Sequence, residues 1–142
     1  MEKIRTHREL RVYQLSFEAG MEIFKISPVK SCFQRGHFVA FNRASKFFPK
    51  EEMYSLTDQI RRSSRSVSGN LTEAFRKRRY PKAFVSKLSD AESEAAETQV
   101  WLDYALECEY LDSEAHAALN DKYDHIISMI VNMCNKPENW SW

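Results

Sequence analysis

The sequence contains little glycine, proline or cysteine. Its 142 residues include three glycines, four prolines and three cysteines. The remaining mix is rich in Ala, Glu, Lys, Leu and Ser, which favours helices over a chain of tight turns. Cys32, Cys108 and Cys134 lie far apart and form no CxxC pair, so neither a zinc site nor a disulfide framework is predicted. A reducing cytoplasm is therefore the expected location.

Several functional motifs are also missing. No apolar run reaches the roughly 18 residues of a membrane span, and the charged start MEKIRTHREL predicts no signal peptide. The sequence has no Gly-rich phosphate loop, HExxH or GxSxG motif, so we expect neither an enzyme nor a cofactor. Glu94 and Glu97 lie one helical turn apart, but no Glu-x-x-His motif accompanies them, so no metal site is predicted.

Four segments show the spacing of amphipathic helices, with short connections between the last three and no strand pattern. This predicts an all-α, antiparallel up-down four-helix bundle that forms a single domain over residues 1–142. Residues 28–46 form an irregular insertion between the first two helices, and 137–142 form a tail. The helices are expected at about 7–26, 50–78, 81–109 and 113–135.

The apolar residues in these segments define the expected core. In the third segment the three- and four-residue spacing is unbroken, through Phe84, Leu88, Ala91, Ala95, Thr98, Leu102 and Ala105. In the first segment a single apolar stripe is formed by Leu10, Tyr13, Phe17, Met21 and Phe24.

The second segment has unusually small residues at its centre. They are Ser63, Ser64, Ser66, Ser68 and Gly69. Small side chains let a neighbouring helix backbone approach closely, so we interpret this stretch as a packing seam. A glycine inside a helix costs up to about 1 kcal/mol, so a packing reason for Gly69 is expected.

Charge is sorted along the chain, although the formal net charge is only +1. From residue 61 to 87 there are nine basic residues and one acid, a local charge of +8, and from 90 to 114 there are nine acids and no Lys or Arg, a local charge of −9. Three interpretations stay open: a phosphate-binding patch for RNA or DNA, a contact between the basic cluster and the acidic stretch of a neighbouring subunit, or plain solvated helix faces. The candidate phosphate contacts are Arg61, Arg62, Arg65, Arg76, Lys77, Arg78, Arg79 and Lys82.

The sequence resembles the four-helix-bundle proteins encoded by intervening sequences of bacterial 23S ribosomal RNA genes, often called the S23 ribosomal protein family. The similar stretches are ELRVYQLSFEAGMEIF at 9–24, FPKEEMYSLTDQIRRSSRSVSGNLTEAF at 48–75, FVSKLSDAESEAAETQVWL at 84–102 and the turn at 108–111. The family pattern places Leu56, Gln59, Arg62, Ser66, Val67, Asn70, Leu71, Glu73 and Ala74 in one specific motif.

This resemblance implies an up-down bundle that assembles as a homopentameric ring, without an established enzyme activity. It also implies a structural role for the polar residues Gln59, Asn70 and Glu73, which could bond within or between subunits. A related branch consists of basic pentamers that bind nucleic acid, and the near-neutral charge of this chain departs from that branch. The segment near 28–45 is a second departure, because family members usually connect the first two helices briefly. The expected function is a non-enzymatic, oligomeric scaffold or binding module with self, RNA or DNA as partners and no membrane contact.

Overall fold

The computed structural model describes residues 4–27 and 48–140, and this part of the chain is helical without a strand. The expected 28–46 insertion and the last two residues of the 137–142 tail lie outside the described residues. Three short 3-10 turns, η1 (His7–Glu9), η2 (Lys50–Glu52) and η3 (Pro137–Asn139), flank the main helices. The main helices are α1 (Arg11–Ile26), α2 (Leu56–Lys77), α3 (Pro81–Glu107) and α4 (Ser113–Asn135).

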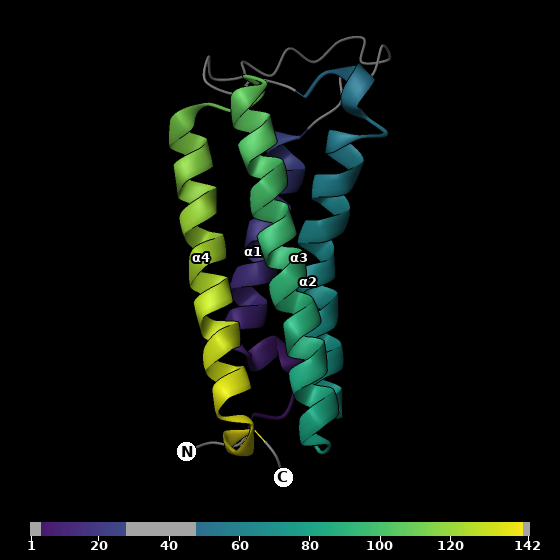
Figure 1. Ribbon diagram of the computed structural model, residues 1–142, viewed down its shortest axis with the longest axis vertical. Helices are drawn as coiled ribbons and strands as arrows, with labels where there is room; N and C mark the ends of the chain where they lie inside the picture. Colours follow the sequence, from purple (N-terminus) through teal and green to yellow (C-terminus); the bar gives the residue numbers. More distant parts are fainter. Residues whose placement is uncertain (1–3, 28–47, 141–142) are drawn as a thin grey trace.

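The helices run alternately up and down along the long axis of a four-helix bundle (Figure 1). Each packs against its neighbours in the chain, and contacts between α1 and α4 close the bundle. Both ends of the described chain and the turn between α2 and α3 lie at the same end of the molecule (Figure 1). None of the described helices is long and apolar enough to cross a membrane.

Local sequence signals set the helix ends. Pro81 occupies the first turn of α3, where its missing N–H is no loss. The Asp112 carboxylate caps α4 by accepting from the Ala115 N–H at 2.8 Å. The segments expected to begin the first two helices at 7 and 50 form the separate turns η1 and η2 instead.

The core follows the expected spacing in α3. Its buried residues are Phe84, Leu88, Ala91, Ala95, Thr98, Leu102 and Ala105. α4 supplies the facing layer with Leu119, Tyr123, Ile126, Ile130 and Met133. Since α3 contributes mostly small residues at its centre, its neighbours can approach closely there.

The apolar stripe predicted for the first helix is wrong for three of its five residues, since only Leu10 is buried and Tyr13 half-buried. The residues that α1 buries are Val12, Ser16, Ala19 and Ile23, whereas Phe17, Met21 and Phe24 stay 55 %, 41 % and 44 % exposed. Small residues face the core here because α1 packs closely on α2: the Ser16 and Ser68 hydroxyls share a hydrogen bond of 3.1 Å. The larger apolar side chains are left on the outside of the bundle.

Gly69 lies within α2, and its backbone shows no need for glycine. A Cβ added there would meet nothing within 4 Å. We therefore expect Gly69→Ala to raise the free energy of unfolding by about 0.5–1 kcal/mol, since alanine loses less backbone entropy in a helix. Urea unfolding at low protein concentration measures this. Gly20→Ala makes the same exchange where the added Cβ would lie 3.7 Å from the Ser64 carbonyl oxygen, so it is the matched variant. A loss of stability in Gly69→Ala would contradict the expectation.

Glu52 organises the start of α2. Its carboxylate accepts hydrogen bonds from the Ser55 hydroxyl, the Leu56 N–H and the Tyr110 hydroxyl. The bond from Ser55 and then the one from Leu56 hold the pKa of Glu52 below its ordinary value. A lowered folded-state pKa adds stability at pH values above the unfolded-state pKa, and this stability is lost as the pH falls through the folded-state pKa.

We therefore expect the natural chain to lose more stability than Glu52→Gln when the pH falls below about 4. Thermal unfolding followed over a pH series measures the difference between the two chains. The control is Glu51→Gln, because the exposed Glu51 carboxylate makes no hydrogen bond within the described chain. Parallel pH curves for the natural chain and Glu52→Gln would contradict this role of Glu52.

Candidate functional site

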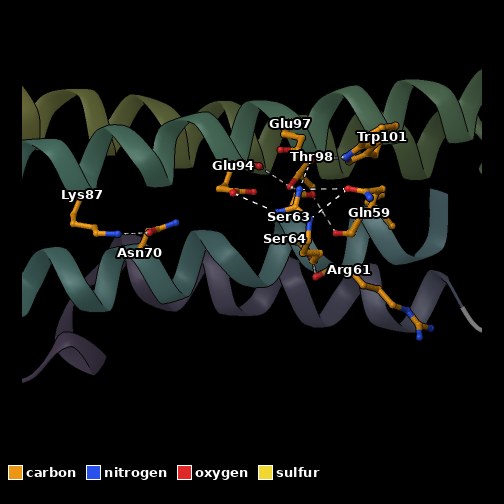
Figure 2. A network of polar contacts seen from close by, with 12 residues as sticks. Gln59, Arg61, Ser63, Ser64, Asn70, Lys87, Glu94, Glu97, Thr98 and Trp101 are labelled. Atoms are coloured by element: carbon orange, nitrogen blue, oxygen red, sulfur yellow. Dashed lines mark hydrogen bonds and ion pairs between the residues drawn. The ribbon is translucent and has the colours of Figure 1, made fainter. Parts of the chain in front are cut away.

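A layer of small hydroxyl residues joins α2 to α3 at the middle of the bundle. Ser63 and Thr98 are fully buried and their hydroxyls share a hydrogen bond of 2.9 Å (Figure 2). Thr98 also donates to the Glu94 carbonyl oxygen at 2.8 Å, and the Ser64 hydroxyl donates to the Arg61 carbonyl oxygen at 3.1 Å. Of the small-residue seam expected from the sequence, Ser63 and Ser64 therefore lie buried between helices, with their hydroxyls bonded to Thr98 and to the backbone, whereas Gly69 is exposed.

Arg62 is neutralised by acids of its own chain. Its guanidinium contacts the Glu97 carboxylate at 2.5 Å and the Glu94 carboxylate at 3.5 Å. Gln59 accepts from the same guanidinium at 3.4 Å, and the Trp101 indole donates to Glu97 at 3.1 Å. Two acids of the 90–114 stretch, on α3, therefore form ion pairs with a candidate arginine of α2 within a single subunit.

The other polar motif residues also bridge α2 and α3. The Lys87 ammonium contacts the Glu73 carboxylate at 3.0 Å, the Asp90 carboxylate at 3.3 Å and the Asn70 amide oxygen at 3.4 Å. The bond to Glu73 and then the bond to Asp90 raise the pKa of Lys87. The polar contacts of Gln59, Asn70 and Glu73 therefore all lie within the bundle: Gln59 contacts Arg62, and Asn70 and Glu73 contact Lys87.

Arg61 and Arg65 lie beside α1. Arg61 donates from Nε to the Ser27 hydroxyl at 3.0 Å and also bonds the Ser27 carbonyl oxygen, while its guanidinium lies 4.9 Å from the centre of the Phe24 ring. It thereby bonds the residue at the C-terminal end of α1. Arg65 is exposed and lies 6.0 Å from the same ring.

Arg78 does not fit the expectation of an exposed phosphate contact. Its residue is only 4 % exposed, the guanidinium lies 3.6 Å from the centre of the Phe75 ring, and it donates to the Phe75 carbonyl oxygen at 2.6 Å. Burial, followed by repulsion from Arg76 and Arg79, lowers its pKa. We therefore correct the candidate set: Arg78 helps to close the turn after α2.

The remaining basic residues gather at one end of the bundle. Arg76, Lys77, Arg79 and Lys82 are exposed, and within the described chain none of them forms an ion pair. The N-terminal segment adds the exposed Arg5, Arg8 and Arg11, because η1 packs against α2. We call these seven residues the basic end. The sequence reasoning missed its N-terminal part, although an up-down topology places the start of the first helix beside the end of the second.

The opposite end carries acids. Glu107, Glu109 and Glu114 are exposed around the turn between α3 and α4. Glu109 has a φ of 60°, a left-handed conformation that closes this turn. The described bundle therefore has opposite charges at its two ends.

No group of three or more His, Cys, Asp or Glu side chains in the described ranges is arranged to hold a metal ion. Two open grooves lie between helices at the surface. One of about 350 Å³ lies between α1 and α2 and is lined by aromatic and small residues. Another, of about 500 Å³, lies between the start of α1 and the end of α4.

The structure is therefore a closely packed four-helix bundle. Polar contacts at Ser63 and Thr98 and ion pairs of Arg62 and Lys87 join α2 to α3, and the two ends of the bundle carry opposite charges. The chain belongs to the 23S rRNA-intervening sequence protein family, whose model matches residues 36–132. This confirms the resemblance found in the sequence.

A solved structure supports the same fold. It is a protein of unknown function from the S23 ribosomal protein family of Bacteroides thetaiotaomicron VPI-5482, 23 % identical over 87 % of this chain and 97 % of that chain, with a TM-score of 0.65. At this identity the likeness shows the fold alone. The comparison with curated proteins finds no match.

Proposed function

We propose that this chain is a non-enzymatic, cytoplasmic binding module that holds the phosphate backbone of RNA or DNA at its basic end. The observation that carries the proposal is the exposure of Arg76, Lys77, Arg79 and Lys82 without an ion-pair partner in the described chain. Cations that are not neutralised internally release counterions from a nucleic acid when they bind it, and this drives sequence-independent affinity.

The arrangement of the basic end favours backbone contact over base recognition. Tyr80 is the large aromatic residue of this turn, and it is 63 % exposed between Arg79 and Pro81. One ring can stack on one base, whereas sequence-specific binding to single strands needs several such platforms. We therefore expect weak discrimination between sequences and a strong dependence on salt.

Fluorescence anisotropy with labelled single-stranded RNA and DNA, titrated over a range of salt concentrations, tests the proposal. The expected plot of log K against log salt has a slope of about −3, which corresponds to about four single-strand phosphate contacts. A flat plot, or no binding at low salt, would overturn the proposal.

A second candidate is a purely structural assembly in which the basic end of one subunit meets acids of the next. The exposed carboxylates of Glu107, Glu109 and Glu114 favour it, because they lie at the opposite end of the bundle. The contact would then stack subunits head to tail. Light scattering in low and high salt tests it: an assembly that dissociates in high salt supports this candidate, and a monomer at low salt excludes it.

A further inference from the structure

A further open groove lies between the start of α2 and the end of α3, at the acidic end of the bundle. Its volume of about 450 Å³ falls within the size range of ligand sites in proteins. Three aromatic side chains line it, Tyr54, Trp101 and Tyr104. The groove therefore gathers aromatic rings at the end of the molecule that lies away from the basic end.

Two of these rings are more exposed than packing of the bundle requires. Tyr54, in the turn between η2 and α2, is 90 % exposed, and Tyr104 of α3 is 57 % exposed. Trp101 is half-buried and lies about one helical turn before Tyr104. The centres of the Trp101 and Tyr104 rings are 5.8 Å apart and their planes differ by 33°, so the two rings form one aromatic surface.

A hydrogen bond fixes the position of the Trp101 ring. Its indole Nε1–H donates to the Glu97 carboxylate at 3.1 Å (Figure 2), and the same carboxylate contacts the Arg62 guanidinium. The polar edge of the indole is thereby engaged within the chain, while the ring lines the groove. A ring that is already held in place loses little freedom when a ligand binds to it.

The groove combines these rings with negative charge. Glu52 lines it, and three hydrogen bonds from within the chain keep this carboxylate in place. Among the described residues that line the groove there is no Lys or Arg. The third helix adds no basic residue after Lys87, and Glu107 is exposed near its end. A ligand that is favoured here is therefore a cation.

The hydrogen-bond acceptors of the groove narrow the class of cation. Both oxygens of the Glu52 carboxylate accept from within the chain, and the Gln59 amide oxygen accepts from Arg62. A primary ammonium has three N–H donors that each need an acceptor. A quaternary ammonium has none, and aromatic rings bind it through the attraction between its charge and their π faces. The groove thus fits a quaternary ammonium better than a primary one.

We propose that this groove is a binding site for a quaternary ammonium group, which contacts the rings of Trp101, Tyr104 and Tyr54 beside the Glu52 carboxylate. The group belongs either to a small choline-like molecule or to a trimethyl-lysine side chain of another protein, since both carry the same trimethylammonium. The site goes beyond the proposed nucleic-acid binding and does not depend on it, because it lies at the opposite end of the bundle.

Titration of the isotope-labelled full chain with choline, followed by NMR, tests the site. The chain has three tryptophans, and the Trp101→Phe variant identifies the indole N–H signal of Trp101. We expect this signal to shift with a saturable dependence on choline. The signal of Trp140, at the other end of the bundle, should stay in place. The neutral analogue of choline, in which a tert-butyl group replaces the trimethylammonium, should bind at least tenfold more weakly.

Substitutions identify the rings that bind. Tyr104→Leu removes an exposed ring and should weaken choline binding roughly threefold to tenfold, and Tyr54→Leu should have a similar effect. Tyr104→Phe keeps an aromatic ring and should keep the affinity. The matched control is Tyr80→Leu, which makes the same exchange at an exposed tyrosine of the opposite end and should change nothing. Circular dichroism of every variant confirms that the fold is retained.

A peptide with one trimethyl-lysine, compared with the same peptide carrying unmodified lysine, separates the two sources of the group. Tighter binding of the trimethylated peptide than of choline assigns the site to a protein side chain, and tighter binding of choline assigns it to a free molecule; either result supports the site. Equal binding of choline and its neutral analogue, a Trp101 signal that does not move, or an unchanged affinity in Tyr104→Leu would each overturn it.

Discussion

Replacing Arg76, Lys77 and Arg79 together by alanine should weaken binding to single-stranded RNA by roughly tenfold or more at low salt and make the slope of log K against log salt shallower by about 2. The three side chains are exposed and form no ion pair in the described chain. Their removal therefore takes away phosphate contacts without disturbing an internal partner. Fluorescence anisotropy over a salt series measures both quantities.

The matched control for this variant is Lys25→Ala with Lys50→Ala. Both lysines are exposed and lie near the end of the bundle opposite to the basic end. The control removes positive charge without touching the basic end, so its slope should stay close to that of the natural chain. A loss of binding of the same size per removed charge in both variants would mean that affinity follows net charge alone, and the basic end would then have no special role.

Ser63→Leu should lower the free energy of unfolding by roughly 2–4 kcal/mol. Forcing extra volume into a packed interior costs about 1–3 kcal/mol, and the hydrogen bond to Thr98 adds about 1 kcal/mol. Ser63 is fully buried between α2 and α3, so the larger side chain pushes these helices apart. Urea unfolding followed by circular dichroism measures the change.

Two further variants separate the effect of the added side-chain volume from the effect of the lost hydrogen bond. Ser63→Ala removes only the hydroxyl, so we expect a loss of about 0.5–1.5 kcal/mol. Ser86→Leu makes the same exchange on the exposed surface of α3 and should change stability by less than about 0.5 kcal/mol. If Ser63→Leu were as stable as Ser86→Leu, the close approach of α2 and α3 would not be a requirement of the fold.

The sequence pattern identified the core of α3 because the three- and four-residue spacing of its core face is unbroken along the whole helix. All seven expected positions are buried, from Phe84 to Ala105. On α1 two faces compete. The large residues Phe17, Met21 and Phe24 form the stronger pattern, but the smaller Val12, Ala19 and Ile23 are buried. Hydrophobicity by itself favours the larger side chains, whereas close packing against the small residues of α2 selects the smaller ones.

The sequence shows that basic and acidic residues are separated along the chain, but it does not show which charged side chains form ion pairs and which are buried. Arg62 and Arg78 belong to the same basic cluster, yet Arg62 pairs with Glu94 and Glu97 while Arg78 is buried on Phe75. These outcomes depend on which helix face each side chain occupies and what lies opposite. The basic end gains Arg5, Arg8 and Arg11 for the same reason, since the bundle topology places a distant segment beside the α2–α3 turn.

Hydrogen exchange of the full chain with and without single-stranded RNA tests the central claim most directly. The account predicts that RNA slows the exchange of backbone amides at the α2–α3 turn, residues 76–82, and in the segment 5–11. It also predicts little change around the acidic turn at 107–114. Protection at that acidic turn, with none at the basic end, would contradict the account.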